Sequence, residues 1–402
     1  MNEKIKERIE RIKNKSFPEG YKLIDSAIIP EDWILNKIVD TCPLQRGFDL
    51  TVDSVNEGHY PVCYSNGILR SHSEFKVKGP GVITGRSGTI GKVFYVEEKF
   101  WPHNTSLWVT DFKGNFPKFI YYLLTFIDLN KFSAGTGVPT LNRNDVHSFK
   151  VAIPPIPEQE KISIILSTWD KAIELKEQLI EEKKYQKSGL MKKLLTSEVR
   201  MPGFEGEWKE VRIGDLVEEV NRIEKWEDDK LYDLVSVRRR SEGLFHRDSL
   251  YGYKIATKNL TPIKEGDFLI SKMQVVHGAL SEVKKDFEGY YVSGSYIILN
   301  SRESKKFNIR FYHYLSNLPV MYRKALRSSY GVHIEKMTFN LKLYLGEKIY
   351  IPSDINEQNK IVQILDCLTE EIALLVNELE TLKIQKKGLM KLLLTGIVRV
   401  QS

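Results

Sequence analysis

The feature that most constrains this chain is a segment of fifteen residues that occurs twice. QKSGLMKKLLTSEVR stands at residues 186–200 and QKKGLMKLLLTGIVR at 385–399, and the two copies differ at four positions. The repeat extends upstream, because 158–200 aligns with 357–399 without a gap and 21 of the 43 positions are identical. An internal repeat at a fixed offset, here 199 residues, predicts two copies of one structural unit.

Apolar residues in both copies follow heptad spacing, which predicts long helices that pack against a partner helix. Each helix is expected to span about 38 residues, or roughly 57 Å at ~1.5 Å per residue. Lysines interrupt the series at 176, 183, 187 and 386, where their apolar stems can pass the seam. We expect the two seams to pair with each other in antiparallel orientation. The series are Ile162, Leu166, Trp169, Ile173, Ile180, Leu190 and Leu194, and Ile361, Leu365, Leu368, Ile372, Leu375, Leu379, Leu382, Leu389 and Leu393.

Two details of these helices carry expectations of their own. Asp354 and Glu357 have the spacing of a capping box at the start of the second helix. Gly189 and Gly388 interrupt the two helices at the same register, where glycine costs about 1 kcal/mol relative to alanine. Their repetition indicates close approach of another backbone, and a kink or an early helix end is the alternative.

The segments that precede the helices contain short strand-like runs, such as GVITG and GDFLIS, separated by turn residues. Each also has one helical stretch, at 116–127 and 310–326, and βαβ alternation is absent. We therefore predict an α+β fold with an internal pseudo-two-fold repeat: two similar mixed α/β domains held apart by a long antiparallel coiled coil. The predicted segments are an N-terminal helical arm (1–30), domain 1 (31–152), helix 1 (153–200), domain 2 (201–351) and helix 2 (352–402).

Composition agrees with a multi-domain globular protein in a reducing compartment. A length of 402 residues exceeds one ordinary core, and 42% of the residues are hydrophobic. No apolar run is long enough to cross a bilayer, and the charged first residues are unlike a signal peptide, so we expect a cytoplasmic protein without a membrane. Three cysteines without a C-x-x-C pair are typical of free thiols. The net charge of +7 is compatible with a nucleic-acid partner.

Motifs for catalysis or metal binding are weak. TGRSGTIGK (84–92) departs from the phosphate-loop spacing, and a tight turn that exposes Arg86 and Ser87 explains it better. Cys42, His59, Cys63 and His72 lack finger-like spacing, so no zinc site is expected. We predict no catalytic residue, no metal site and no cofactor bound by this chain.

Side chains suited to reading DNA recur instead at matching places in the two domains. Arg86 and Ser87 follow GVITG as Lys272 and Gln274 follow the strand in GDFLIS, and HNTS (103–106) and SGS (293–295) open matching strands. Two Gly/Ser loops at 133–143 and 327–336 complete the correspondence, and the alternative for each residue is a solvated loop. The candidate DNA-binding residues are Arg86, Ser87, Asn104, Thr105, Thr136, Arg143, Arg238, Arg239, Arg240, Lys272, Gln274, Ser293, Ser295, Arg327, Tyr330 and His333.

With these motifs the chain resembles the specificity (S) subunit of type I restriction–modification systems over nearly its whole length. The most specific elements are IPPIPEQEKI (153–162) and the two Q-K-x-G-L-M-K-x-L-L-T segments, together with GRSGTIGK and HNTSLWV in domain 1. The second helix start, IPSDINEQNKI, has one extra residue, and domain 2 lacks GRSGTIGK. The two domains are therefore expected to read different sequences.

The resemblance implies a non-catalytic subunit of an adenine-N6 methyltransferase and ATP-dependent restriction complex. Each target-recognition domain would read one half of a gapped, bipartite site in double-stranded DNA, and the paired helices would set the gap. Two methyltransferase subunits would bring S-adenosylmethionine and flip the adenine. Two restriction/translocase subunits would bring ATP and Mg²⁺.

Three further expectations follow. The ridge that includes Leu190, Leu194, Leu389 and Leu393 is predicted to take part in methyltransferase docking. Arg238–Arg240 are predicted to contact phosphates, whereas Lys272 or Arg327 would alter the preference of one half-site. The rival functions are a coiled-coil scaffold that binds only proteins and a self-contained DNA enzyme.

Overall fold

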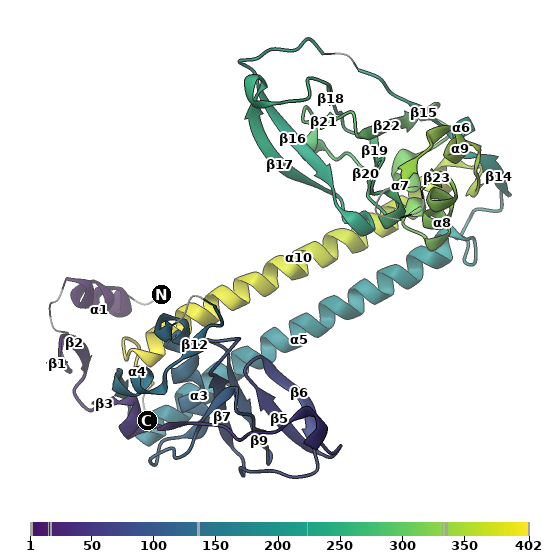
Figure 1. Cartoon of the computed structure of the whole chain (residues 1–402). Helices are drawn as coiled ribbons and strands as arrows, with labels where there is room; N and C mark the ends of the chain where they lie inside the picture. Colours follow the sequence, from purple (N-terminus) through teal and green to yellow (C-terminus); the bar gives the residue numbers. More distant parts are fainter. Residues whose placement is uncertain are drawn as a thin grey trace. The chain divides into compact units, whose positions relative to one another are not determined.

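The computed structural model describes residues 3–14, 16, 18–134, 137–222, 224–331, 333 and 337–400. The chain divides into two compact units, and each combines a globular domain with parts of both long helices (Figure 1). Unit 1 comprises Met1–Gln178 and Asn377–Ser402, and unit 2 comprises Leu179–Val376. The long helices are α5 (Ile156–Leu195) and α10 (Ile355–Leu394), so each begins in the unit of the domain before it and ends in the other unit.

The first unit is built around a four-stranded sheet in the order β4-β10-β7-β8. Its central strand β7 is buried along its whole length, as expected for the continuous apolar run GVITG. The helices of its globular part are α1 (Glu3–Lys13), α2 (Ile38–Thr41), α3 (Pro117–Phe126) and α4 (Arg143–Ser148). Its strands are β1 (Tyr21–Ile24), β2 (Ala27–Pro30), β3 (Ile34–Lys37), β4 (Leu44–Arg46), β5 (Tyr60–Tyr64), β6 (Gly67–His72), β7 (Gly81–Gly85), β8 (Val93–Val96), β9 (Trp101–Pro102), β10 (Ser106–Val109), β11 (Ser133–Ala134), β12 (Thr140–Leu141) and β13 (Lys150–Ile153).

The second unit repeats this plan with the sheet β15-β22-β19-β20. A second four-stranded sheet, β17-β16-β21-β18, stands where unit 1 has the three strands β6-β5-β9. The helices of its globular part are α6 (Ile213–Leu216), α7 (Ile309–Ser316), α8 (Pro319–Arg327) and α9 (Leu341–Gly346). Its strands are β14 (Trp208–Arg212), β15 (Val217–Glu219), β16 (Leu231–Val237), β17 (Leu244–Tyr251), β18 (Leu260–Pro262), β19 (Phe268–Ser271), β20 (Leu280–Glu282), β21 (Tyr291–Ser293), β22 (Tyr296–Ser301), β23 (Ser329–Tyr330), β24 (Thr338–Phe339) and β25 (Lys348–Pro352).

Single-turn 3₁₀ segments connect several of these elements. They are η1 (Val52–Ser54), η2 (Leu129–Phe132), η3 (Arg239–Ser241), η4 (Gly252–Lys254), η5 (Val275–His277) and η6 (Lys285–Phe287).

Two local predictions need correction. Residues 1–30 are not wholly a helical arm, because the antiparallel hairpin β1–β2 follows α1, with Asp25 and Ser26 in the left-handed conformation that tight hairpin turns use. The stretch 310–326 is two helices. Pro319 begins α8, and since a proline disfavours helical backbone in the residue before it, α7 ends at Ser316.

Within each unit the two helices run antiparallel, with their heptad seams facing inward. In unit 1, Lys176 Nζ lies 2.8 Å from Glu378 Oε2, and Lys383 Nζ lies 2.9 Å from Glu177 Oε1. In unit 2, Lys183 Nζ lies 2.6 Å from Glu371 Oε1. In unit 1 the partner numbers fall on α10 as they rise on α5, because Asp170 pairs with Lys386 and Lys176 with Glu378. The expected antiparallel pairing is confirmed, and seam lysines 176 and 183 end in ion pairs with the facing helix.

The repeated tail closes the core of the other domain. Leu194 and Leu195 at the end of α5 lie in the core of unit 2, beside Ile361 and Leu365 of α10. At the corresponding place in unit 1, a core cluster holds the end of α10 together with the start of α5 (Met390, Leu393, Leu394, Ile162 and Leu166). The tail of α5 is therefore part of the core of unit 2, and the tail of α10 is part of the core of unit 1.

A buried carboxylate joins each tail to its domain. Arg399 donates from Nε and Nη2 to Glu158 at 2.9 and 2.8 Å, and Arg200 donates in the same way to Glu357 at 2.8 and 2.9 Å. Both glutamates are buried. Glu357 therefore pairs with the tail instead of closing the predicted capping box, and Asp354 caps α10 by accepting from the Asn356 N–H at 2.8 Å.

The polar partners of these glutamates are also duplicated. Trp33 Nε1 donates to Glu158 at 2.9 Å, and Trp208 Nε1 donates to Glu357 at 3.4 Å. Two ion pairs on buried carboxylates, with matching tryptophans at the same repeat positions, hold each tail against its domain.

Candidate functional site

In unit 1 the predicted residues meet at the end of strand β7. The Arg86 N–H donates to Thr105 O at 2.8 Å, and the Arg86 carbonyl accepts from the Leu141 N–H at 2.7 Å. The Arg86 guanidinium reaches the Asn104 carbonyl at 3.5 Å. Arg86 therefore joins three loops: its own, the loop before β10 and the loop that ends at β12. Ser87 lies in the same junction, because it bridges to Thr140 and its N–H donates to Thr105 O at 3.2 Å.

In unit 2 Lys272 occupies an equivalent junction at the end of β19. Its N–H donates to Ser295 O at 2.9 Å, and its carbonyl accepts from the Phe339 N–H at 3.2 Å. Its ammonium donates to the Gly294 carbonyl at 2.8 Å. The three contacts of Lys272 correspond one by one to those of Arg86. The positional match inferred from the two strand ends is thus present in the structure, and contact with DNA stays a prediction.

Side chains around the first junction are held by hydrogen bonds. Asn104 Nδ2 donates to Asp49 Oδ1, and Thr105 Oγ1 lies 2.9 Å from His103 Nδ1. Burial lowers the pKa of His103, which favours the neutral ring that can pair with a hydroxyl. Tyr64 packs on the His103 ring with centroids 4.3 Å apart. Sequence reasoning missed Tyr64 and His103, although His103 directly precedes the two residues it named.

The second junction differs in its neighbours. Ser293 is partly buried at the end of β21, and Ser295 is exposed. The Gln274 side chain is partly buried, and its Oε1 has no hydrogen-bond partner among the described residues. Its backbone carbonyl accepts from the Ala279 N–H at 3.1 Å, which closes the loop 274–279 beside the strand end.

Arg238–Arg240 form a fixed, exposed turn in unit 2. Arg240 and Ser241 have φ angles of 57° and 55°, in the left-handed region that costs free energy for residues other than glycine. The Ser241 N–H donates to Gly278 O at 2.7 Å, and Ser241 Oγ lies 3.0 Å from Tyr322 Oη. The Arg238 guanidinium lies over the Phe245 ring, 4.8 Å from its centroid. Tyr322 and Gly278, which hold this turn, were not identified from sequence.

The remaining predicted residues lie on the surface of their domains or outside the described part. Tyr330 is 57% exposed in the pair β23–β24, which matches β11–β12 of unit 1. Arg327 is exposed and its Nη2 pairs with Glu347 Oε2 at 3.0 Å. Arg143 begins α4 on the surface, and His333 is exposed. Thr136 falls outside the described residues.

The predicted docking ridge needs correction. Leu194 and Leu393 are 3% and 2% exposed because each lies in a core of this chain, so neither is available to a partner. Leu190 and Leu389 are partly buried against the same cores. A heptad pattern indicates that a residue is buried, but it does not tell whether this chain or a partner protein buries it.

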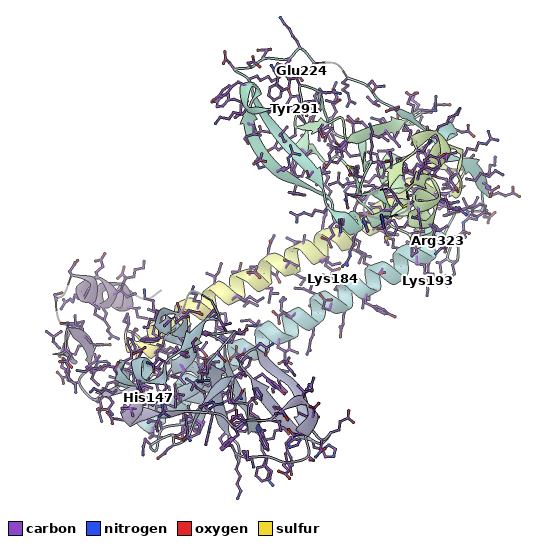
Figure 2. All side chains as sticks on the ribbon, in the orientation of Figure 1. His147, Lys184, Lys193, Glu224, Tyr291 and Arg323 are labelled. Carbon is purple, nitrogen blue, oxygen red and sulfur yellow. The ribbon has the colours of Figure 1, made fainter. Side chains whose placement is uncertain are left out.

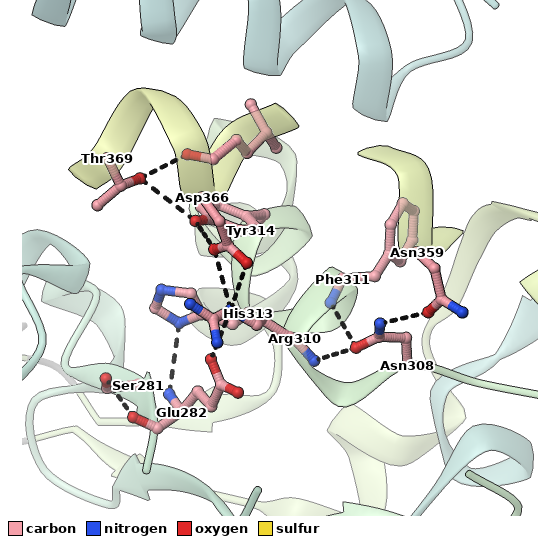
Figure 3. Close-up of polar contacts among 11 residues, drawn as sticks. Ser281, Glu282, Asn308, Arg310, Phe311, His313, Tyr314, Asn359, Asp366 and Thr369 are labelled. Carbon is pink, nitrogen blue, oxygen red and sulfur yellow. Dashed lines mark hydrogen bonds and ion pairs between the residues drawn. The ribbon is translucent and has the colours of Figure 1, made fainter. Parts of the chain in front are cut away.

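A polar network joins domain 2 to α10 (Figure 3). Asp366 on α10 accepts from Arg310 Nε at 2.9 Å and from Tyr314 Oη at 2.5 Å. Beside them, burial lowers the pKa of His313 to about 3, and its Nδ1 accepts from the Glu282 N–H at 3.4 Å. Burial also raises the pKa of the Glu282 carboxyl. These groups hold α10 against domain 2. Their hydrogen bonds to one another account for their burial without a bound ligand.

The described residues form neither a metal site nor a membrane span. No group of three or more His, Cys, Asp or Glu side chains among them is arranged to hold a metal ion. Within the same ranges, every helix is too short or too polar to cross a membrane.

Two α+β domains of one plan, each with a cation at the same loop junction and each closed by the helix tail of the other repeat, define a protein with two repeated domains and two matching loop junctions. The chain belongs to the family of the type I restriction modification DNA specificity domain, whose model matches residues 30–184 and 205–383. Both matches begin at a globular domain and continue into a long helix. The two matched segments therefore correspond to the two structural repeats.

Known proteins resemble the chain over nearly its full length. The specificity subunit of the type I restriction enzyme MjaVIII from Methanocaldococcus jannaschii is 24% identical, and the alignment covers 96% of this chain and 97% of that protein. The crystal structure of an S subunit of a type I restriction–modification system from M. genitalium aligns with a TM-score of 0.59 at 16% identity, covering 93% of this chain and 98% of that one. A second solved structure comes from work on complex assembly and conformational transition of the type I R-M system. It aligns with a TM-score of 0.58 at 15% identity, and the alignment covers 92% of this chain and 99% of that one. At these identities the two structures support the fold alone.

Proposed function

We propose that this chain is the DNA-specificity subunit of a type I restriction–modification complex. The observation that carries the proposal is the matched pair of junctions, in which Arg86 and Lys272 make the same three contacts in two domains of one plan. Arginine and lysine both pair with guanine O6 and N7, and the loops around them differ in sequence. Each domain would therefore read its own half of a bipartite, gapped duplex site.

The chain supplies recognition and not the chemical step. S-adenosylmethionine would be carried by the methyltransferase partner, and ATP with Mg²⁺ by the restriction partner. The chain's residues would orient the duplex, so that the adenine to be methylated is presented at a fixed distance from each junction. A protein-only scaffold is the alternative, and it predicts no preference among duplex sequences.

Half-site selection tests the proposal. Selection of bound duplexes from a random library should return a bipartite motif for the wild-type chain with its methyltransferase subunits. Arg86→Ala should relax the preference in one half only, and Lys272→Ala in the other half only, because each good base contact provides about 1–3 kcal/mol of discrimination. An unchanged motif in both variants would show that neither cation reads a base. No enrichment for the wild-type complex would favour the scaffold.

We also propose that exposed apolar residues on the two helices dock the two methyltransferase subunits. Leu175 and Tyr185 on α5 are 53% and 83% exposed, and their repeat equivalents Leu374 and Ile384 on α10 are 64% and 71% exposed. Each unit thus exposes one leucine from one helix and one large apolar side chain from the other. Because these exposed residues recur at the repeat offset, they support a stoichiometry of two methyltransferase subunits for each S chain.

The helix glycines give a prediction in which stability and docking change in opposite directions. Both helices continue past Gly189 and Gly388, and outside the adjoining turns of the same helix no atom of the described residues lies within 4 Å of a Cβ added at either position. The alternative of an early helix end is therefore wrong, and the expected close approach is not made by any other segment that the structure describes. Gly189→Ala and Gly388→Ala should each stabilise the free chain by about 1 kcal/mol. Both should weaken methyltransferase binding if a partner's backbone approaches these positions.

Thermal unfolding of the free chain and titration with methyltransferase subunits measure the two effects. Gln186→Ala, at an exposed position one turn before Gly189, is a matched control that changes neither the glycine nor its register. Higher stability with unchanged partner affinity would place the docking surface elsewhere on the helices.

A further inference from the structure

A basic recess lies in unit 2 between helix α5, the turn η3 and helix α10. Its volume is about 360 Å³, and its lining includes the cations Lys184, Lys187 and Arg240 but no acidic residue. Figure 2 labels Lys184 on α5. Ser188, Ser241 and Tyr322 add hydroxyl groups to the lining. With Thr369, three cations and four hydroxyls line one recess, and they form a set of donors suited to an oxyanion.

The repeat shows that this charge is specific to unit 2. The positions of Lys184 and Lys187 correspond to Lys383 and Lys386 in unit 1. There Lys386 pairs with Asp170, and Lys383 pairs with Glu177 at 2.9 Å. In unit 2 the positions of these two acids are occupied by Thr369 and Val376. Two acidic partners of the lysine pair are therefore missing from unit 2, where the lysines face a recess.

The surroundings of Lys187 leave its charge only partly compensated. Its pKa is lowered by burial and then by the positive charge of Lys284, while Asp366 acts in the opposite direction. Asp366 is already bonded to Arg310 and Tyr314. The Lys184 ammonium pairs with the exposed Glu181 at 2.7 Å. An anion in the recess would restore the favourable environment that Asp170 gives to Lys386 in unit 1.

The recess is continuous with the candidate DNA-binding site of domain 2. Its Arg240 and Ser241 belong to the strained turn, and the Ser241 N–H is bonded to Gly278 in the loop that follows Lys272. Backbone strain held in place by Gly278 and Tyr322 is typical of functional turns. An anion bound here would lie beside the surface that we assign to a DNA half-site, which favours a phosphate of the duplex as the occupant.

We propose that Lys184, Lys187 and Arg240 form a phosphate clamp for the DNA backbone, in which the helix following domain 1 completes the DNA-binding site of domain 2. The inference rests on the proposed function and adds to it a sequence-independent contact. The helix would hold the duplex in register while the loop residues read bases, a division of roles that phosphate and base contacts usually show. In unit 1 Asp170 and Glu177 neutralise the corresponding lysines, so we expect no equivalent clamp there.

The test is the salt dependence of duplex binding by the full chain. Lys187→Gln and Arg240→Gln should each reduce the slope of log K against log salt by about 0.9 for each phosphate that the variant no longer neutralises, which corresponds to roughly eightfold weaker binding at ~0.1 M salt. The selected target and an unrelated duplex should weaken by the same factor. Thr369→Asp, which restores the acid found in unit 1, should have the same effect while it keeps every cation. Lys386→Gln removes one positive charge in unit 1 and should leave the slope unchanged.

Each outcome has a distinct meaning. If the wild-type chain prefers its target but Lys187→Gln and Thr369→Asp keep the wild-type slope, the clamp is wrong and the proposed function stands. If the wild-type chain shows no preference, the proposed function fails. Weaker methyltransferase binding in these variants with unchanged DNA binding would assign the recess to an acidic protein segment. Stabilisation of the wild-type chain by inorganic phosphate, without any slope change in the variants, would make it a small-anion site. Either of these last two results would overturn the clamp.

Discussion

Replacing Arg399 with alanine should lower the unfolding temperature of unit 1 by about 10 °C and leave unit 2 nearly unchanged. The substitution removes both hydrogen bonds from the arginine to Glu158, whose side chain is only 5% exposed. A buried carboxylate that loses its partner costs about 3–5 kcal/mol, and the partial exposure of Arg399 favours the lower end of this range. For a unit of this size, 1 kcal/mol shifts the midpoint by about 2–4 °C.

Hydrogen exchange resolved by peptide identifies which unit opens. Protection should fall in the sheet β4-β10-β7-β8 and stay high in β15-β22-β19-β20. The matched control is Arg200→Ala, which should reverse the pattern because Arg200 holds Glu357 in unit 2. Loss of protection confined to the last residues of the chain would mean that the tail is a dispensable appendage.

Glu158→Gln combined with Arg399→Ala separates the two contributions. Glutamine still accepts a hydrogen bond from Trp33 Nε1, which donates to Glu158 at 2.9 Å, but it carries no charge. The double variant should therefore be more stable than Arg399→Ala alone, since no unpaired charge remains buried.

The repeat predicted the helices well because it is a local and periodic signal. Both were expected at about 38 residues, and each spans 40 residues in the structure. The match between Arg86 and Lys272 was also predictable, since both follow a buried strand directly. The buried apolar run determines where each strand ends, and the position of the residue directly after the strand is constrained by that end.

Predictions failed where packing between distant segments decides the outcome. Leu194 and Leu393 fit an exposed docking ridge and a buried core equally well as members of a heptad. The tail arginines 200 and 399 recur at the repeat offset, as do Glu158 and Glu357. Their recurrence was a usable signal that sequence reasoning missed, because it treated Glu357 only as a cap. Tyr322 and Gly278 gave no such signal, since their role depends on how the turn at Arg240 folds back.

Lengthening both helices by one heptad should change the gap between the half-sites that the protein selects. Insertions between Ile173 and Ile180 and between Ile372 and Leu379 fall at the same repeat position and keep the phase of both seams. The added helix rises by roughly 10 Å at ~1.5 Å per residue. Since DNA rises about 3.4 Å per base pair, the preferred gap should grow by about three base pairs.

The affinity at the new gap should still be lower than at the original gap for the wild-type chain. Three added base pairs rotate the second half-site by roughly 100° at about 10.5 base pairs per turn. A heptad that keeps the seam rotates the domain much less, so the duplex must twist or bend to meet both domains. Selection from a library with fixed half-sites and variable gaps measures the preference. A four-residue insertion in both helices is the control, because it breaks the seam and should abolish selection at every gap. If the heptad variant keeps the wild-type gap, the helices do not set the spacing, and the repeat serves only to close the two domain cores.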